Sequence, residues 1–462
     1  MSANATGGDA SCTNCAHNEG AVHDIEDIGK FMTADRRMTS RRVLDALAAR
    51  KENTGLEGFM FSDPEVYKAD LEHIFHKEWV FAGHDIEIPE VGQWLSLKVG
   101  DFPVVIVRGR DKKVHAYHNV CRHRGSKVVG GLSGEGADEV EERTGMLSSK
   151  NLSCPYHKWQ YDTDTGKLLY AREMSDDFDG ETHGLLPVHL ECVSSYMFVC
   201  VADSAPDISR MTQIIATCAE PYRFENAKVA FQSVTVEKGN WKLVWENNRE
   251  CYHCEANHPE LVKSFPADWV QSEDGDAGGE AAKKLQIPSD FITLNNNQFR
   301  IMRHSFTADD DGEVARSMTM DGKPIGNKRF GRMPAGDENV GNMPMYCYPS
   351  TWNHWQPDYA LSFRVVPISP TETEVVTTYL VPKDAIEGKD YTIKSLTEVW
   401  EATNNQDRII VERQQQGVSS PAFRPGFYNK THESGVIEFV QWYHDLLEPR
   451  LSADLRRGAS KM

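Results

Sequence analysis

Two short cysteine–histidine segments constrain this 462-residue chain more than any other feature. The first holds Cys121 and His123, and the second holds Cys154 and His157. Together the segments offer two sulfur and two nitrogen ligands. That set suits a tetrahedral zinc ion, or a [2Fe–2S] cluster with two cysteines on one iron and two histidines on the other. Either group requires a fold in which two loops, distant in sequence, meet.

The spacing favours an iron–sulfur cluster of the Rieske type over zinc. The pair Cys121 and His123 is tighter than the Cys-x2–4-Cys pairs that dominate zinc ribbons and fingers. A Rieske cluster moves single electrons. The chain is therefore predicted either to relay electrons or to use them in chemistry of its own. The alternative is a binding module stabilised by a structural zinc ion.

Charge and composition argue against several kinds of partner. The formal net charge of −19 opposes binding to nucleic acid or to an anionic membrane surface. No run of about 18 apolar residues is present, so we expect no transmembrane helix, and the first residues lack the apolar core of a secretory signal. The ten cysteines form no dense disulfide framework. We expect a reduced, cytoplasmic setting and interpret Cys12 and Cys15, in a polar leader, as incidental.

The apolar pattern predicts an α+β protein with two folded domains. We expect a flexible extension at 1–54 and a helical segment at 55–78 that packs on the larger domain. A small all-β domain at 79–204 carries the cluster ligands. The larger domain, at 205–462, is expected to hold an antiparallel sheet flanked by helices.

Within the small domain, alternating runs predict hairpins beside both metal half-sites. The paired runs are Phe102–Arg108 with Lys113–Val120, and Tyr161–Asp164 with Leu168–Tyr170 before and after a turn that ends at Gly166. Between the half-sites, the Gly-rich, acidic stretch Gly130–Asn151 is interpreted as an exposed insertion, either a tolerated surface loop or a docking loop for a partner.

Outside the small domain, the predicted elements alternate between strands and helices. They are a helix capped by Thr39-Ser40 and running to Arg50, a helix over 64–77, a strand at Val229–Glu237, helical content at Trp241–His253, paired strands at Val365–Pro367 and Glu374–Val381, a long helix over Thr392–Gln416 closed by Gly417, and a final helix at Phe439–Leu447.

A second metal site is predicted around His253 and His258. Positions five apart lie about 140° apart on a regular helix. Both imidazoles can therefore face one metal only if the helix is bulged or ends between them, and Pro259 is consistent with an end. Two imidazoles and one carboxylate form the facial triad of non-haem Fe(II) oxygenases. Alone this spacing is weak evidence, but a Rieske cluster in the same chain needs an acceptor for its electron.

Asp407 is the candidate for the third ligand. It lies on the apolar stripe of the long predicted helix, which also carries Leu396, Val399, Trp400, Thr403, Ile410 and Val411. A carboxylate on a buried face is costly unless a cation pairs with it, and iron supplies that cation. The alternative is a buried ion pair with Arg408 or Arg413. Glu412 and Asp390 fit the face less well.

Glu250 is a candidate for a supporting role at this second site. It precedes His253 by three residues, which is one helical turn on the same face. A carboxylate there can hydrogen-bond the ligand imidazole from outside, fixing the ring and raising its basicity. A solvent-exposed helix charge is the alternative.

These motifs together resemble the catalytic α-subunits of the Rieske non-haem iron oxygenases, over most of the chain. The resemblance implies a helix-grip-like larger domain that performs catalysis. It also implies that Cys121 and Cys154 bind one cluster iron and His123 and His157 the other. His253, His258 and Asp407 would hold a mononuclear Fe(II), with O2 as co-substrate. A pure Rieske electron carrier would need no such second site.

The resemblance further implies a homotrimer, in which a carboxylate bridges the cluster of one subunit to the iron of the next. Glu250 occupies that position. Ring-hydroxylating members usually carry aspartate there, whereas glutamate resembles the branch that acts on quaternary ammonium compounds, such as carnitine oxygenase. The thirty residues between His123 and Cys154 also exceed the usual family spacing, which bears on reductase docking.

Further segments resemble the glycine betaine and proline betaine demethylases: 247–254, 258–261 and 349–354. This implies oxidative N-demethylation of a quaternary ammonium compound with release of formaldehyde, using NAD(P)H electrons from a separate flavin or ferredoxin-type reductase. Aromatic faces hold such cations. The candidate cage residues are Tyr346, Tyr348, Trp352, Trp355 and Phe363, with ordinary core packing as their alternative role. Aromatic-ring hydroxylation and carnitine-type C–N cleavage are the rival activities.

Overall fold

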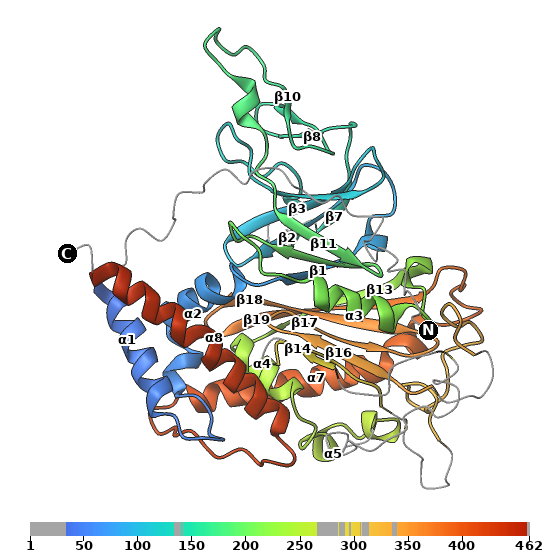
Figure 1. Cartoon of the computed structure of the whole chain (residues 1–462). Coiled ribbons are helices and arrows are strands. Elements are labelled where there is room, and N and C mark those ends of the chain that lie inside the picture. The colour runs from blue at the N-terminus through green and yellow to red at the C-terminus, as the bar shows by residue number, and fades with distance from the viewer. Residues whose placement is uncertain are drawn as a thin grey trace, which may run out of the picture. The chain divides into compact units, whose positions relative to one another are not determined.

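The computed structural model describes residues 34–133, 140–141, 143–265, 285, 292–294, 297–304, 306, 314–334 and 340–459. Cys12 and Cys15 lie outside these residues. The described chain forms two compact units (Figure 1). The small unit comprises Phe81–Glu220, and the large unit comprises residues 34–80 and 221–459.

The small unit is built from short antiparallel strands. They form sheets ordered β4-β3-β2-β7, β10-β9-β8, β1-β12-β11 and β5-β6. The strands are β1 (Val80–His84), β2 (Gln93–Val99), β3 (Phe102–Arg108), β4 (Val114–His118), β5 (Leu132–Ser133), β6 (Val140–Glu141), β7 (Thr144–Met146), β8 (Leu152–Ser153), β9 (Gln160–Tyr161), β10 (Leu168–Tyr170), β11 (His189–Val193) and β12 (Tyr196–Cys200). Helix α3 (Ser209–Ala219) and the single turns η3 (Asp85–Glu87) and η5 (Gly180–His183) complete it.

Both predicted hairpins are confirmed. Strands β3 and β4 pair with Val104 opposite His118, and β9 pairs with β10. The turn between β9 and β10 is closed by the Asp162 carboxylate, which accepts from the backbone N–H groups of Asp164 and Thr165. Gly166 ends the turn at φ +70°, where a Cβ would lie 2.6 Å from the Tyr117 ring.

The stretch Gly130–Asn151 is only partly a loop, which corrects the prediction of a simple insertion. Its segment β7 pairs with β2 as an edge strand of the largest sheet in the small unit. Gly145 in β7 lies under the indole of Trp94, where a Cβ would come within 2.4 Å of the ring. This part of the stretch is therefore held by packing, while residues 134–139 lie outside the described chain.

The large unit is centred on a seven-stranded antiparallel sheet ordered β13-β19-β18-β17-β16-β15-β14. The strands are β13 (Ala227–Glu237), β14 (Ile292–Leu294), β15 (Phe299–Ile301), β16 (Met343–Cys347), β17 (Thr351–Trp355), β18 (Ala360–Ser369) and β19 (Glu372–Pro382). The helices are α1 (Ala34–Ala49), α2 (Pro64–Asp70), α4 (Trp241–Asn248), α5 (Cys254–Asn257), α7 (Ile393–Val418) and α8 (Ser434–Ala459), with short turns η1 (Gly58–Phe61), η2 (Leu71–Phe75), η6 (Phe224–Asn226) and η7 (Leu261–Lys263). Mixed helix and antiparallel sheet confirm the α+β class.

Helix α7 lies against the sheet (Figure 1). Its Glu401 accepts hydrogen bonds from Tyr379 of β19 and from Ser233 of β13. The helix begins at the Thr392 cap, where a capping box with Ser395 closes the first turn. The prediction that Gly417 closes the helix is wrong, because the helix runs on to Val418 and ends at Ser419.

Two other helix boundaries differ from the prediction. Helix α1 begins at Ala34, so Thr39 and Ser40 lie inside it instead of capping it. Helix α8 runs over Ser434–Ala459 and includes Pro449, and is far longer than the predicted Phe439–Leu447. In α8 the buried apolar face continues on both sides of the predicted segment, at Val436 and Leu451.

A buried polar network joins three helices of the large unit. The Asp70 carboxylate, at the end of α2, lies 2.5 Å from the Lys242 ammonium of α4, and both side chains are fully buried. Asp70 also accepts from the Trp241 indole N–H at 3.0 Å and from the Tyr443 hydroxyl of α8 at 2.7 Å. This network anchors α4 immediately before the segment that carries Glu250 and His253.

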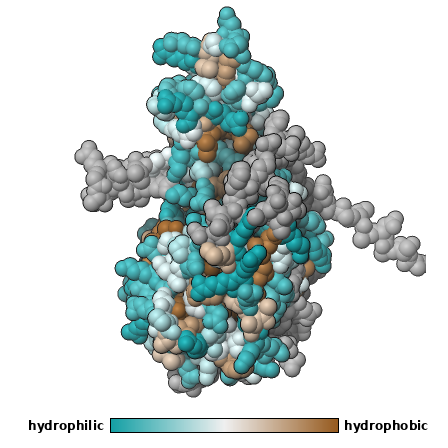
Figure 2. All heavy atoms as spheres, turned by 90° about the vertical axis from the view of Figure 1, so that its left-hand side faces the viewer, coloured by the Kyte–Doolittle hydropathy of each residue, from teal (hydrophilic) through white to brown (hydrophobic). Residues whose placement is uncertain are grey.

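The surface is mainly polar on the face shown in Figure 2, where hydrophobic residues form only small separate patches. Among the described residues, none of the helices combines the length and the hydropathy of a membrane span.

Candidate functional site

The two cysteine loops of the small unit fold in the same way. In each loop the cysteine N–H donates to the carbonyl five residues on, Cys121 to Ser126 and Cys154 to Trp159, both at 2.8 Å. The backbone N–H of the residue four positions after each cysteine, Gly125 or Lys158, donates a hydrogen bond to the cysteine carbonyl, and this residue has a positive φ. Two matching loops thus present one cysteine each, as a shared metal group requires.

The four predicted cluster ligands come together with sulfur inside and imidazole outside. Cys121 and Cys154 are 3% and 1% exposed, and their thiols contact each other. The rings of His123 and His157 lie 4.6 Å apart at the surface side, and His123 stacks on Trp159 at 4.7 Å. Tyr161 Oη lies 3.1 Å from the Cys121 sulfur. Two soft ligands facing two imidazoles fit a Rieske [2Fe–2S] cluster.

In the large unit, a break between helices lets His253 and His258 converge. Helix α4 ends at Asn248 and α5 begins at Cys254, so His253 sits at the start of the second helix and His258 just past its end. Their Nε2 atoms lie 3.0 Å apart. The expectation that the helix must end between the two histidines is met by this short, one-turn helix.

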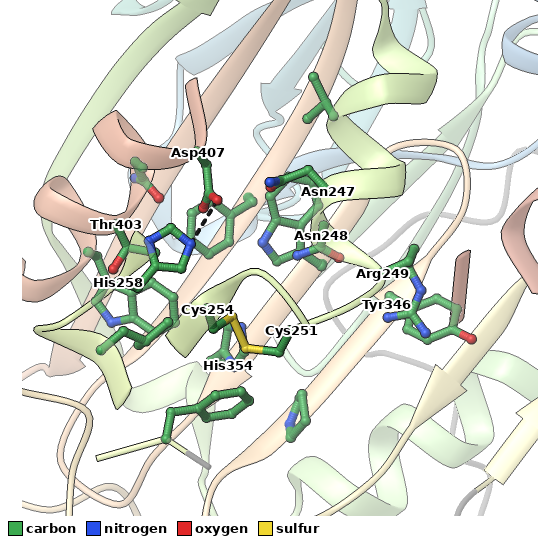
Figure 3. Close-up of a pocket in the computed structure, with 18 of the residues that line it drawn as sticks. Asn247, Asn248, Arg249, Cys251, Cys254, His258, Tyr346, His354, Thr403 and Asp407 are labelled. Carbon is green, nitrogen blue, oxygen red and sulfur yellow. Dashed lines mark ion pairs between the residues drawn. A yellow bond between two sulfur atoms is a disulfide. The ribbon is translucent and has the colours of Figure 1, made fainter. Parts of the chain in front are cut away.

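Asp407 reaches both imidazoles from α7. Its Oδ1 lies 3.2 Å from Nε2 of His253 and 3.0 Å from Nε2 of His258, and Figure 3 shows Asp407 directed at the His258 ring. Arg408 pairs instead with Glu412 at 3.0 Å, so the alternative of an Asp407–Arg408 ion pair is wrong. Three ligand atoms meeting at one point form the two-histidine, one-carboxylate donor set of non-haem Fe(II), and they fit that ion.

The outer nitrogens of both histidines are held by oxygen atoms. Glu250 Oε1 lies 2.5 Å from Nδ1 of His253, and its second oxygen accepts from the His253 backbone N–H at 3.1 Å. Gln406 Oε1 lies 2.8 Å from Nδ1 of His258, and its amide N–H donates to Glu260 at 2.9 Å. These contacts favour protons on the Nδ1 atoms and leave the Nε2 lone pairs free to bind metal.

The local charges prepare the site for a cation. Burial alone would lower the pKa of His253, but hydrogen bonds to Asp407 and Glu250 outweigh it and raise the pKa to about 9. Burial opposes ionisation of Asp407, yet the two imidazoles hold its pKa below the usual value. A metal ion would take over the role of the histidine protons, so its binding releases protons.

The triad opens into a cavity with aromatic walls. Of the predicted cage residues, Tyr346, Trp352 and Phe363 line this cavity. Tyr348 packs in the core against Phe439 and Trp442, and Trp355 packs against Tyr222 and Phe224. Neither Tyr348 nor Trp355 lines the cavity. Trp355 points to the opposite face of β17 from Trp352, and Tyr348 follows the end of β16 and packs in the core.

Sequence reasoning missed several cavity residues. They are Phe265, His354, Trp400, Thr403 and the pair Cys251 and Cys254, which the structure joins in a disulfide (Figure 3). Trp400 and Thr403 precede Asp407 by seven and four residues on the same stripe of α7, so the helical pattern contained the signal for both. Nothing in the spacing separates a disulfide from two free thiols.

Both sites lie in regions of the chain that match models of known protein families. The model for the ring hydroxylating alpha subunit (catalytic domain) matches residues 224–449, and that for the Rieske [2Fe-2S] domain matches residues 78–192. The glycine betaine monooxygenase oxygenase subunit of Pseudomonas aeruginosa (strain UCBPP-PA14) is 41% identical over 431 residues, covering 90% of this chain and 95% of that protein.

More distant relatives share the fold or one part of the chain. The carnitine monooxygenase oxygenase subunit of Escherichia coli (strain K12) is 31% identical over 218 residues, or 45% of this chain and 53% of that one. A crystal structure of a quaternary ammonium Rieske monooxygenase superposes with a TM-score of 0.66 at 19% identity, covering 87% of this chain and 98% of that chain. Because one relative is 41% identical over 90% of this chain and both domain models match, the chain belongs to the Rieske non-haem iron oxygenases. It is an oxygenase α-subunit related to those of glycine betaine monooxygenases.

Proposed function

We propose that this chain catalyses the O2-dependent oxidative N-demethylation of a small betaine, glycine betaine first and proline betaine second, with release of formaldehyde. The observation that carries the proposal is an Fe(II)-type triad opening into a cavity walled by aromatic rings. The 41% sequence identity to a glycine betaine monooxygenase oxygenase subunit, over 95% of the length of that protein, supports the substrate class.

When bound by His253, His258 and Asp407, Fe(II) supplies the O2-activating chemistry that oxidises a C–H bond of an N-methyl group. The role of the protein is to leave coordination positions open and to hold one methyl group close to them. Hydroxylation of that methyl gives a carbinolamine, which collapses to formaldehyde and the tertiary amine. Electrons come from NAD(P)H through a separate flavin or ferredoxin-type reductase.

The aromatic wall is suited to the ammonium end of a betaine. The rings of Trp352 and Phe363 stack with centroids 4.9 Å apart, and Trp400 lies edge-on to Phe363 at 5.7 Å. A quaternary ammonium has no N–H to donate, so it is held by ring faces instead of by hydrogen bonds. We infer that these three residues form the cation site, since the Tyr346 ring already carries the Arg249 guanidinium at 3.8 Å from its centroid.

We infer that the carboxylate end of the substrate points away from the metal. On α7 the rise of 1.5 Å per residue places Trp400 about 10 Å along the axis from Asp407, so the cavity extends past the cation site. His354 contacts Trp400 there at 4.8 Å. Burial lowers the pKa of His354 to about 3, and its Nδ1 accepts from the Asn342 amide at 3.2 Å, which leaves Nε2–H to donate. We infer that His354 binds the substrate carboxylate.

The deciding experiment measures oxygen uptake and formaldehyde release by iron-loaded protein with a reductase and NADH. Glycine betaine, proline betaine, carnitine and an aromatic acid are tested in parallel. We expect formaldehyde to match the oxygen consumed with one of the two small betaines. Activity with the aromatic acid alone would contradict the substrate class, and trimethylamine released from carnitine would favour C–N cleavage.

We further propose that the chain assembles as a homotrimer, with Glu250 as the carboxylate that carries electrons between neighbouring subunits. The glutamine variant Glu250→Gln keeps an oxygen that can accept from Nδ1 of His253, so both metals should remain bound. We expect reoxidation of the reduced cluster by substrate and O2 to slow by about 10–100-fold, as followed by stopped-flow absorbance.

A matched control for Glu250→Gln is Glu255→Gln, which changes an exposed carboxylate of the neighbouring helix α5 that the site does not use. This control should reoxidise at close to the normal rate. Normal reoxidation in Glu250→Gln itself would remove Glu250 from the electron route.

A further inference from the structure

The disulfide between Cys251 and Cys254 lies within the metal-binding segment. The two residues are adjacent to Glu250 and His253, and both are buried, 5% and 4% exposed. Both line the same cavity as the triad, and Figure 3 shows the sulfur bridge close to His258. This pair has no role in the proposed demethylation chemistry.

The sulfur of Cys254 lies within reach of a metal at this site. Its Sγ and one ring nitrogen each of His253 and His258 all lie within 4.8 Å of one another. In the disulfide the sulfur has no negative charge and is a poor ligand. As a thiolate it would be a strong one, and a Cys–His–His set is a tight site for zinc.

Backbone hydrogen bonds also hold the turn, in addition to the disulfide. The backbone N–H of Cys254 donates to the carbonyl of Cys251 at 3.0 Å, and the N–H of His258 donates to the carbonyl of Cys254 at 2.8 Å. Because these bonds join backbone atoms, we expect them to remain when the sulfurs are reduced and to keep Cys254 beside the two histidines. We therefore expect the redox state of the two cysteines to change which atoms can bind a metal, while the backbone of the segment keeps its conformation.

We propose that Cys251 and Cys254 are a reversible dithiol–disulfide pair that selects the metal bound at His253 and His258. In the disulfide form the site offers two imidazoles and the Asp407 carboxylate, which suit Fe(II). In the dithiol form Cys254 joins the histidines and the site takes zinc, which is redox-inactive.

The oxidation is a two-electron step with hydrogen peroxide as the oxidant. Two thiols and one peroxide give one S–S bond and two molecules of water, with the O–O bond broken. A dithiol or phosphine reductant reverses the step by breaking the S–S bond and returning a proton to each sulfur. Zinc binding to the reduced form displaces the Cys254 thiol proton.

The test uses the cluster-containing protein after a chelator has removed the mononuclear iron. One half is treated with a phosphine reductant and the other with limited peroxide, and cluster absorbance verifies that the small unit is intact. Differential alkylation and peptide mass spectrometry report the state of both cysteines. Competition with a chromophoric chelator gives the zinc affinity of each form.

We expect the peroxide-treated peptide to resist alkylation at both cysteines, and the reduced protein to bind zinc more than about tenfold more tightly. Cys251→Ser leaves Cys254 unable to pair within the segment, so this variant should bind zinc tightly without prior treatment with the reductant. Cys254→Ser should bind zinc weakly after either treatment. Cys218→Ala, which removes a buried free thiol of α3, should behave like the unaltered protein.

Two results would overturn the proposal. One is full alkylation of Cys251 and Cys254 after peroxide treatment that leaves the cluster intact. The other is equal zinc affinity of the oxidised and reduced proteins. Neither result depends on turnover, so both stand apart from the demethylation assay.

Discussion

Replacement of Asp407 by alanine is expected to abolish turnover and to remove the mononuclear iron, while the absorbance of the Rieske cluster stays unchanged. Asp407 supplies the one carboxylate among the three side chains, with His253 and His258, whose polar atoms meet at the proposed iron site. Loss of an outer partner of a metal ligand already costs about 10–100-fold. We therefore expect loss of a direct ligand to lower iron affinity by at least about 100-fold, as measured by iron content after dialysis against a chelator.

The matched control for Asp407→Ala is Glu412→Gln. Glu412 lies on the same helix but pairs with Arg408 instead of with a histidine. This variant should keep the iron and most of its activity, because a partly exposed i, i+4 pair contributes only about 0.3–0.5 kcal/mol. Retention of mononuclear iron by Asp407→Ala, or loss of the cluster together with it, would mean that Asp407 is not a ligand.

The local parts of both sites could be predicted from the sequence. Cys121 and His123, like Cys154 and His157, are close enough in sequence for their spacing to define a half-site. Asp407 is 149 residues beyond His258, yet a carboxylate on an apolar helical stripe needs a buried cation, and that requirement identified it. The hairpins followed from alternation and turn residues for the same reason: the determining contacts are short-range.

The walls of the cavity could not be predicted from the sequence, because they depend on which face each strand turns toward α7. Tyr346 and Trp352 pair across β16 and β17 and both line the cavity, but Tyr348, two residues on, follows the end of β16 and packs in the core against α8. Trp355 is three residues after Trp352 and thus points to the opposite face. The sequence shows that all of these residues are aromatic, but it does not show which of them line the cavity.

The second large effect is expected in stability: Lys242→Met should destabilise the large unit by about 3–5 kcal/mol. Lys242 and Asp70 are both fully buried, with 2.5 Å between the ammonium nitrogen and the carboxylate oxygen. Without the ammonium, Asp70 retains only the neutral donors of Trp241 and Tyr443. A buried carboxylate with no counter-charge must either stay ionised at a high desolvation cost or take up a proton. Denaturant unfolding measures the loss.

Two control variants separate the buried charge from the side chain itself. Lys394→Met removes the exposed partner of Glu398, a pair on the surface of α7, and should change stability by less than about 0.5 kcal/mol. The double variant Asp70→Asn with Lys242→Met leaves no buried charge and should recover part of the loss. A loss below about 1 kcal/mol in Lys242→Met would show that the ion pair is not a source of stability.

The position of this ion pair links stability to the metal site. Lys242 is in the first turn of α4, and the same short helix leads directly to Glu250 and His253. If the network holds α4 in place, Lys242→Met should also weaken iron binding at His253, although Lys242 contacts no metal ligand. Lower iron content in this variant, restored in the double variant, would show that the orientation of α4 sets the geometry of the triad. Unchanged iron content in a destabilised protein would show that the break after Asn248 isolates the triad from the core.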